Sequence, residues 1–210
     1  MKTLLLLIAP LLLTVSSFGA TYSWTNWYEP DRATPWSVPG NWLPNGEPVA
    51  GDTVIFTNDP LNEDLVIYLP QVETIGEMIV SNCNNVRFGT IGDPATGLIF
   101  DNGAENAKLI FRDGTKSWGG IEFRNSVTVV VENTTLDVDL GDQDYHYGIT
   151  LSGMIGGNGD ITIVSDNGTA LPARLNLQQD YPSPFTGTLI LDGVSIRFGN
   201  GGNPFPNATV

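Results

Sequence analysis

The sequence predicts an all-β domain, and it favours a right-handed parallel β-helix over an antiparallel β-sandwich. Short runs of alternating apolar and polar residues recur along the chain, and Gly, Asn, Asp or Pro separates each run from the next. No helical i, i+3, i+4 stripe appears between residues 147 and 200. This combination is typical of short strands that are joined by tight corners.

Strand signals follow one another at intervals of roughly 10 to 13 residues in the first two thirds of the mature chain. The predicted strands there are Thr53–Thr57, Leu65–Leu69, Glu77–Val80, Val86–Phe88, Gly97–Phe100, Ala107–Phe111, Gly119–Phe123, Ser126–Val131 and Thr135–Leu140. Those closer to the C-terminus are Asp160–Val164, Arg174–Leu177, Thr188–Leu191 and Val194–Phe198. Asp101-Asn-Gly103 and Asp113-Gly114 have the composition of hairpin turns, which keeps the antiparallel β-sandwich open as the alternative.

The N-terminus has the pattern of a secretory signal peptide, assigned to residues 1–19. Lys2 supplies the positive charge, residues 4–13 form a short apolar core, and small residues near Gly19 and Ala20 provide a cleavage site. The apolar run is too short to be a transmembrane helix. The sequence therefore predicts an exported protein.

Residues 20–56 form a segment rich in tryptophan and proline. It holds four of the five tryptophans, Trp24, Trp27, Trp36 and Trp42. Its prolines exclude a long helix or a central strand. Two interpretations are open. The rings either cover the end of an apolar stack, as a solenoid requires, or lie exposed and stack on sugars; the first is favoured.

The stretch from residue 147 to 200 resembles a known repeat. Its order is Ser-Gly-x-Ile-x-Gly-x-Gly, then Leu-x-Leu, then Phe-Thr-Gly, followed by alternating apolar residues and glycines. The positions that carry the resemblance are Ser152, Gly153, Ile155, Gly157, Gly159, Leu175, Leu177, Phe185, Thr186, Gly187, Leu189, Leu191, Gly193, Ile196, Phe198 and Gly199. This pattern resembles the autotransporter-associated β-strand repeat of bacteria, also called the passenger-associated transport repeat.

The resemblance implies a parallel β-helix, and it decides between the two folds that the residues leave open. It also implies a domain order in which residues 20–56 make the cap and first coil and residues 57–210 make the further coils. Residues 201–210 look like the start of another coil, so we expect the β-helix to continue beyond this chain.

The net charge argues against a nucleic-acid partner, and the cysteine content excludes an intrachain disulfide. The formal net charge is −14 with only 9 Lys and Arg, which predicts no nucleic-acid partner because phosphates would be repelled. The single cysteine, Cys83, excludes an intrachain disulfide, and its place after an apolar run favours burial.

The candidate chemical site is the acidic segment 137–146. It holds Asp137, Asp139, Asp142, Asp144 and the only histidine, His146. The first two aspartates alternate with apolar residues and are expected on the outer face of a strand. A solvated strand face is favoured, with weak calcium binding and acid–base catalysis as the alternatives. No catalytic, cofactor-binding or metal-ligating residue is therefore predicted.

The function expected from the resemblance is that of an exported, non-enzymatic surface protein. Its β-helix would resemble an autotransporter passenger, serve as a stalk or adhesion scaffold, and assist secretion. The alternative is a module that binds or degrades polysaccharide, resembling a pectin lyase. The expected location is secreted or on the bacterial cell surface, with extracellular polysaccharide as the candidate partner and no transmembrane segment in this chain.

Overall fold

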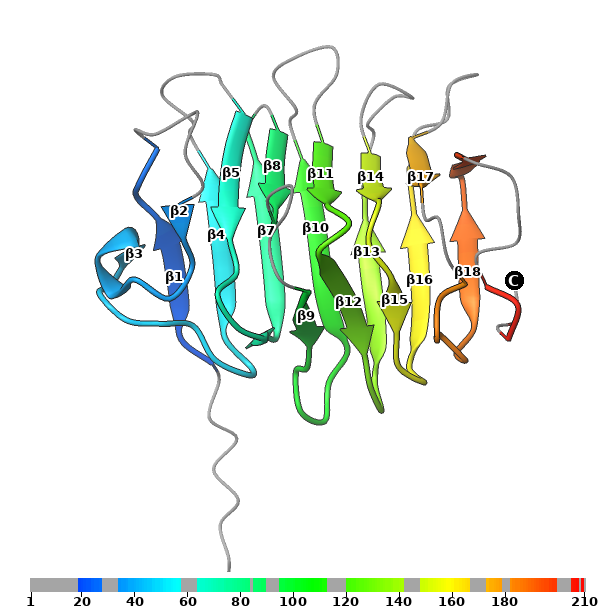
Figure 1. Ribbon diagram of the computed structural model, residues 1–210, viewed down its shortest axis with the longest axis horizontal. Coiled ribbons are helices and arrows are strands. Elements are labelled where there is room, and N and C mark those ends of the chain that lie inside the picture. The colour runs from blue at the N-terminus through cyan, green and yellow to red at the C-terminus, as the bar shows by residue number, and fades with distance from the viewer. Residues whose placement is uncertain are drawn as a thin grey trace, which may run out of the picture.

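The protein is a parallel β-helix in the computed structural model, which confirms the predicted fold class (Figure 1). The structure describes residues 19–27, 34–57, 64–83, 85–89, 95–112, 120–141, 148–166, 173–178, 182–199, 205–207 and 209. The predicted signal peptide thus lies almost wholly outside the described residues. Within them, all strand ladders but one are parallel, so the antiparallel β-sandwich is wrong.

The described strands form three sheets, here called A, B and C. Sheet A contains β1 (Thr21–Trp24), β3 (Trp42–Leu43), β4 (Thr53–Thr57), β7 (Glu77–Ser81), β10 (Ala107–Arg112), β13 (Thr135–Asp139), β16 (Asp160–Val164) and β18 (Leu189–Asp192). Sheet B contains β2 (Thr34–Pro35), β5 (Asp64–Tyr68), β8 (Asn85–Phe88), β11 (Gly120–Phe123), β14 (Gly148–Leu151), β17 (Arg174–Leu177) and β19 (Ser195–Phe198). Sheet C contains β6 (Glu73–Ile75), β9 (Thr96–Phe100), β12 (Val127–Val131) and β15 (Ile155–Gly156). A single 3-10 turn among the described residues, η1 (Pro39–Asn41), precedes β3.

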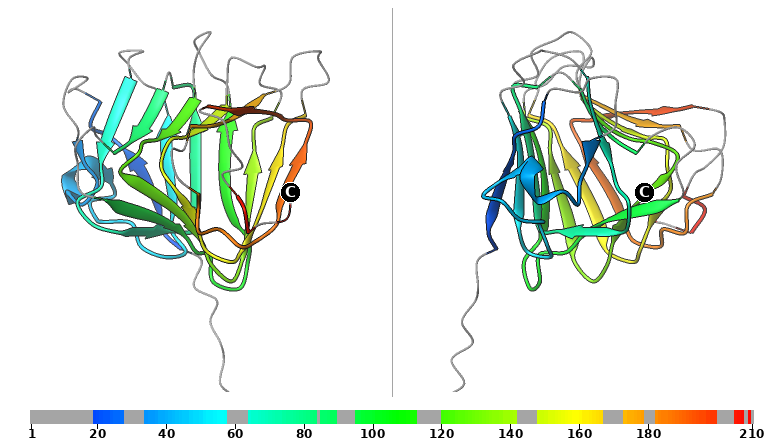
Figure 2. Two further views of the ribbon diagram at one scale, coloured as in Figure 1. Left: turned by 45° about the vertical axis from the view of Figure 1, so that its right-hand side comes forward. Right: turned by 60° about the vertical axis from the view of Figure 1, so that its left-hand side comes forward.

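From β4 to β15 the chain visits the sheets in the order A, B, C and then begins the next coil on A, whereas β1 to β3 and β16 to β19 belong to sheets A and B only. Each strand therefore pairs with the strand one coil away, as in β4 with β7 and β7 with β10. Figure 1 shows the strands of sheet A side by side along the long axis of the molecule, and Figure 2 shows the sheets facing one another around the core. The segment 101–106 links sheet C to sheet A, so it is a corner between sheets and not the hairpin turn of the sandwich alternative.

Alternation along the strands places the same class of residue at the same depth in successive coils. In sheet A, one inner column runs through buried Val54, Met78, Leu109, Val138 and Ile163. Because each apolar side chain lies over another one, every coil removes the apolar surface of its predecessor from water. The core is therefore a continuous stack along the axis.

The N-terminal end of this stack is filled by tryptophan. Trp24, Trp36 and Trp42 are at most 3% exposed. The ring centroid of Trp42 lies 4.8 Å from that of Trp24 and 4.7 Å from that of Trp36, in edge-to-face arrangements. Trp27 is partly buried against the same cluster. The first three rings have no free face for a sugar, so the exposed-platform interpretation is wrong for them, and the cap interpretation fits.

Burial of the described residues is less complete at the opposite end of the stack. Leu191 and Ile196 in the last rung are only partly buried, and Phe198 is 51% exposed, whereas Ile163 and Leu177 one coil earlier are 2% exposed. The described residues place one more parallel bridge beyond β18, between Thr188 and Thr209. Leu189 of β18 is nonetheless 3% exposed and Phe205 is 2% exposed, so burial at this end differs from residue to residue.

Glycines of the repeat-like stretch mark places where coils approach too closely for a side chain. A Cβ atom built on Gly153 would lie 1.9 Å from the carbonyl oxygen of Val127, and one on Gly157 would lie 1.9 Å from that of Val131. Gly157 also has φ +95, which L-residues rarely adopt. The glycine pattern is thus a packing requirement between neighbouring coils.

We expect Gly157→Ala to lower the free energy of unfolding by about 3 kcal/mol or more, because it adds a backbone collision to an unfavourable φ. Gly103→Ala is the matched control. Gly103 also has a positive φ (+66), but a Cβ there meets nothing within 4 Å, so we expect a loss of about 1 kcal/mol. Urea unfolding monitored by circular dichroism measures both. Equal losses would contradict the close-packing explanation.

Candidate functional site

The structure places two of the predicted acidic residues on one strand. Asp137 and Asp139 lie on β13 with partly exposed side chains, as the alternation predicts. Asp142, Asp144 and His146 lie outside the described residues. The proposed acidic cluster is therefore placed only at its N-terminal edge.

Asp137 and Asp139 are both engaged by the preceding coil. The side-chain amide of Asn106 donates a hydrogen bond of 2.9 Å to Asp137 Oδ2. The Arg112 guanidinium forms an ion pair with the Asp139 carboxylate and also donates to the Asp139 carbonyl oxygen. The backbone N–H of Gly141 donates to Asp139 Oδ1 at 3.0 Å. These carboxylates link neighbouring rungs on the outer face of sheet A.

The electrostatics of Asp139 agree with this role. Burial favours a higher pKa, but the hydrogen bond from Arg112, the Gly141 N–H and the positive charge of Arg112 outweigh it and hold the pKa of Asp139 below its usual range. Asp139 is thus a carboxylate at neutral pH, and it is already paired. Among the described residues, no group of three or more His, Cys, Asp or Glu side chains is placed to hold a metal ion.

Cys83 is buried, with 1% exposure, as predicted. Its Sγ lies 3.3 Å from the carbonyl oxygen of Phe56 and 3.1 Å from that of Ser81. The thiol therefore packs as a small apolar group with a weak donor.

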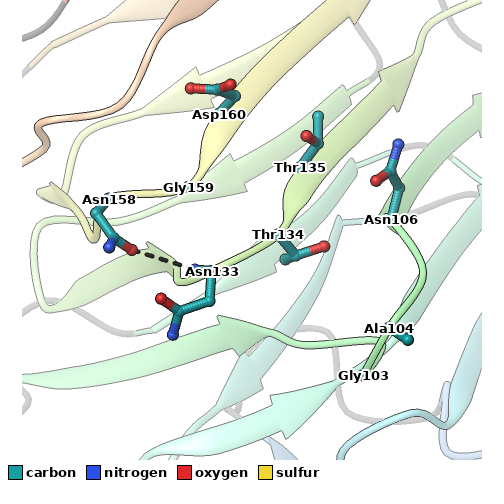
Figure 3. A pocket seen from close by; sticks show the side chains of 9 residues that line it. All are labelled: Gly103, Ala104, Asn106, Asn133, Thr134, Thr135, Asn158, Gly159 and Asp160. Carbon is teal, nitrogen blue, oxygen red and sulfur yellow. Dashed lines mark hydrogen bonds between the residues drawn. The ribbon is translucent and has the colours of Figure 1, made fainter.

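A polar groove lies at the corner where the chain passes from sheet C to sheet A. It has a volume of about 460 Å³ and is wide open to solvent. Its lining residues, which define what we call the corner groove, are Gly103, Ala104, Asn106, Asn133, Thr134, Thr135, Asn158, Gly159 and Asp160. Figure 3 shows that they come from three successive coils.

Parallel register aligns these residues in two columns. Thr135 pairs with Asp160, and Asn106 directly precedes the residue that pairs with Leu136, so these three side chains follow one another along the axis. Asn133 and Asn158 occupy the second column, two residues earlier in their coils. Neighbouring strands lie about 4.8 Å apart, so each column presents a polar group at that repeat.

Internal hydrogen bonds fix part of the groove. The backbone N–H of Asn133 donates to Asn158 Oδ1 at 3.1 Å, the dashed line of Figure 3. The Thr134 hydroxyl donates to the carbonyl oxygen of Glu105 at 3.0 Å, and Asp160 Oδ1 accepts the Thr188 N–H at 2.8 Å. Asn133 adopts φ 57, a conformation that Asn and Gly tolerate best. The corner is therefore held by its own backbone and side-chain contacts.

The sequence pattern predicts only that the Asn and Gly residues of this segment form corners between strands. That interpretation is correct for the backbone, since Gly103 and Asn133 have positive φ. It missed that the corners of three coils lie in register and form a surface. The available signal was the recurrence of Asn, Thr and Asp just before the strands that begin near residues 107, 135 and 160.

No helix in the described part of the chain has the length and apolar character needed to cross a membrane. The chain matches no protein-family model, and searches of curated proteins and of solved structures found no significant match. The resemblance of residues 147–200 to the autotransporter-associated β-strand repeat therefore stays a prediction from the sequence.

Proposed function

We propose that this chain is an exported, non-enzymatic surface protein of a bacterium and that its β-helix serves as a stalk or adhesion scaffold. The observation that carries the proposal is the uninterrupted axial stack, closed by tryptophan at one end and built coil upon coil from there. A solenoid of this kind depends on contacts between neighbouring coils, so it can fold progressively from one end. Progressive folding suits a role in assisting secretion.

The contacts of the Asp137 and Asp139 carboxylates support a scaffold role over an enzymatic one. Acid–base catalysis by a carboxyl group needs a pKa raised toward neutral pH and a substrate site within reach. Asp139 instead has a lowered pKa and an Arg112 partner, and Asp137 accepts from Asn106. Both serve the ladder between coils.

Export is tested by expressing the full chain in a Gram-negative bacterium and determining the N-terminus of the product. We expect cleavage after residue 19 or 20 and recovery of the mature protein outside the cytoplasm. A chain that begins at residue 20 is the control and should stay in the cytoplasm. Uncleaved full-length chain in the cytoplasm would contradict the proposal.

The enzymatic alternative is tested separately with the purified mature protein. We expect no cleavage of polygalacturonate by the parent chain. Cleavage that is lost in an Asp142→Asn, Asp144→Asn variant would support a polysaccharide-degrading enzyme and overturn the non-enzymatic role.

A further inference from the structure

We propose that the corner groove binds a neutral, hydroxyl-rich glycan that lies along the axis of the β-helix. The inference deepens the proposed adhesion role, on which its biological meaning rests, by naming the site and the class of ligand. The binding itself is a property of the mature chain and is independent of export.

The groove offers hydrogen-bonding groups that the fold leaves unused. Among the described residues, no partner is found for the side-chain amide of Asn133 or the hydroxyl of Thr135. Asn158 uses only its Oδ1, and Asp160 only its Oδ1, in the contacts described above. The free groups include both donors and acceptors. A ligand whose hydroxyl groups can both donate and accept matches this mixture.

The arrangement favours a linear ligand. The unused groups lie in two parallel columns on two successive coils, Asn133 and Thr135 on one and Asn158 and Asp160 on the next, with strands about 4.8 Å apart. Polar groups on successive coils therefore follow one another along the axis, which suits an extended ligand. The groove is open along its length and does not enclose its occupant. It can therefore contact an internal segment of a chain as well as an end.

Charge selects a neutral glycan over an acidic one. None of the residues lining the groove is a lysine or an arginine, and Asp160 lies within it. The protein as a whole has a formal charge of −14, so a polyanion would be repelled. The lining also contains no large apolar or aromatic side chain, which disfavours an apolar ligand. Hydrogen bonds would therefore carry the affinity.

The test is native affinity electrophoresis of the mature chain in gels that contain dextran, a soluble mannan or hydroxyethyl cellulose, with polygalacturonate as the acidic comparison. The variant is Asn133→Gly combined with Thr135→Val. Glycine accepts the positive φ of residue 133, and valine keeps the shape of threonine, so the variant removes the two unused groups with little effect on the fold. Thr162→Val, on β16 outside the groove, is the matched control.

We expect at least one neutral polysaccharide to slow the parent chain and the Thr162→Val control equally. The double variant should bind about 10-fold or more weakly, since each lost neutral hydrogen bond changes affinity roughly 2- to 10-fold. Retardation by polygalacturonate alone, equal retardation of the parent and the double variant, or no retardation by any of the neutral polysaccharides would each overturn the proposal. Circular dichroism melting of all three proteins confirms that the fold is retained.

Discussion

Trp42→Ala is expected to lower the free energy of unfolding by about 3–5 kcal/mol, the usual cost of removing a buried aromatic ring. The ring is 1% exposed and lies between Trp24 and Trp36. Its indole Nε1 also donates a hydrogen bond of 2.8 Å to the carbonyl oxygen of Trp36. The substitution would open a cavity at the end of the stack where the first coil is closed.

Trp27→Ala is the control for this prediction, because it removes the same side chain from a partly buried position. We expect a loss of less than about 2 kcal/mol there. Urea unfolding of the parent chain and both variants gives the comparison. A Trp42→Ala variant as stable as the Trp27→Ala variant would show that the tryptophan cluster does not close the core.

The second large effect concerns Glu73, an acidic residue at an inner position of sheet C. It is 4% exposed, and its Oε1 is buried with no hydrogen-bond partner among the described residues. Burial, followed by the negative charge of Glu47, raises the pKa of Glu73 to about 7, and Gln71 partly opposes this shift. The carboxyl group is therefore largely protonated in the folded protein below neutral pH.

Because the pKa in the folded state is raised above the ordinary value of 4.5, protonation of Glu73 stabilises the fold. This contribution is fully present below about pH 4.5, falls by about 1.4 kcal/mol per pH unit as the unfolded state releases its proton, and is lost above pH 7. The total change is roughly 3 kcal/mol at most. The pKa of Asp139 is lowered in the folded state, so its contribution to stability is present at neutral pH. That contribution is lost only as the pH falls to more acidic values.

Glu73→Gln mimics the protonated carboxyl and is expected to remove most of the fall in stability between pH 5 and pH 7. It should also make the protein more stable than the parent at pH 8. Glu47→Gln is the control, and it should weaken the pH dependence without removing it. Urea unfolding at pH 5, 6, 7 and 8 measures the three proteins. A parent chain whose stability rises over this range would contradict the assignment.

The sequence predicted sheets A and B better than sheet C. The predicted strands Thr53–Thr57 and Arg174–Leu177 have the bounds observed, because their alternation of apolar and polar residues is regular. In sheets A and B, strands β2, β3 and β14 were not predicted. In sheet C, β6 and β15 were not predicted: β6 carries Glu73 at an inner position, which hides its alternation, and β15 is two residues long. The alternation of residues along one strand cannot show that a charged residue is buried, because contacts with the rest of the fold decide its burial.

Strand direction and the corner groove could not be derived from local pattern for a related reason. Asp101-Asn-Gly103 is compatible with a hairpin or with a corner between sheets, and only the neighbouring coils decide between them. The groove depends on residues that are about one coil apart in the sequence, such as Asn133 and Asn158, and on the register that aligns them. The number of residues in a coil varies, because the spacing between Thr53 and its partner Glu77 differs from that between Glu77 and its partner Lys108. No fixed period in the sequence therefore reveals the register of the strands.

The most direct test is a series of spin-label distances along sheet A in a Cys83→Ala background. One label at Ile190 is paired in turn with labels at Lys108, Glu77 and Thr53, which lie three, four and five rungs away in register. In-register parallel coils predict distances that rise by about 4.8 Å per rung, from about 14 Å to about 24 Å between backbone positions. Distances that fail to increase with rung number would contradict the stacked β-helix and, with it, the corner groove.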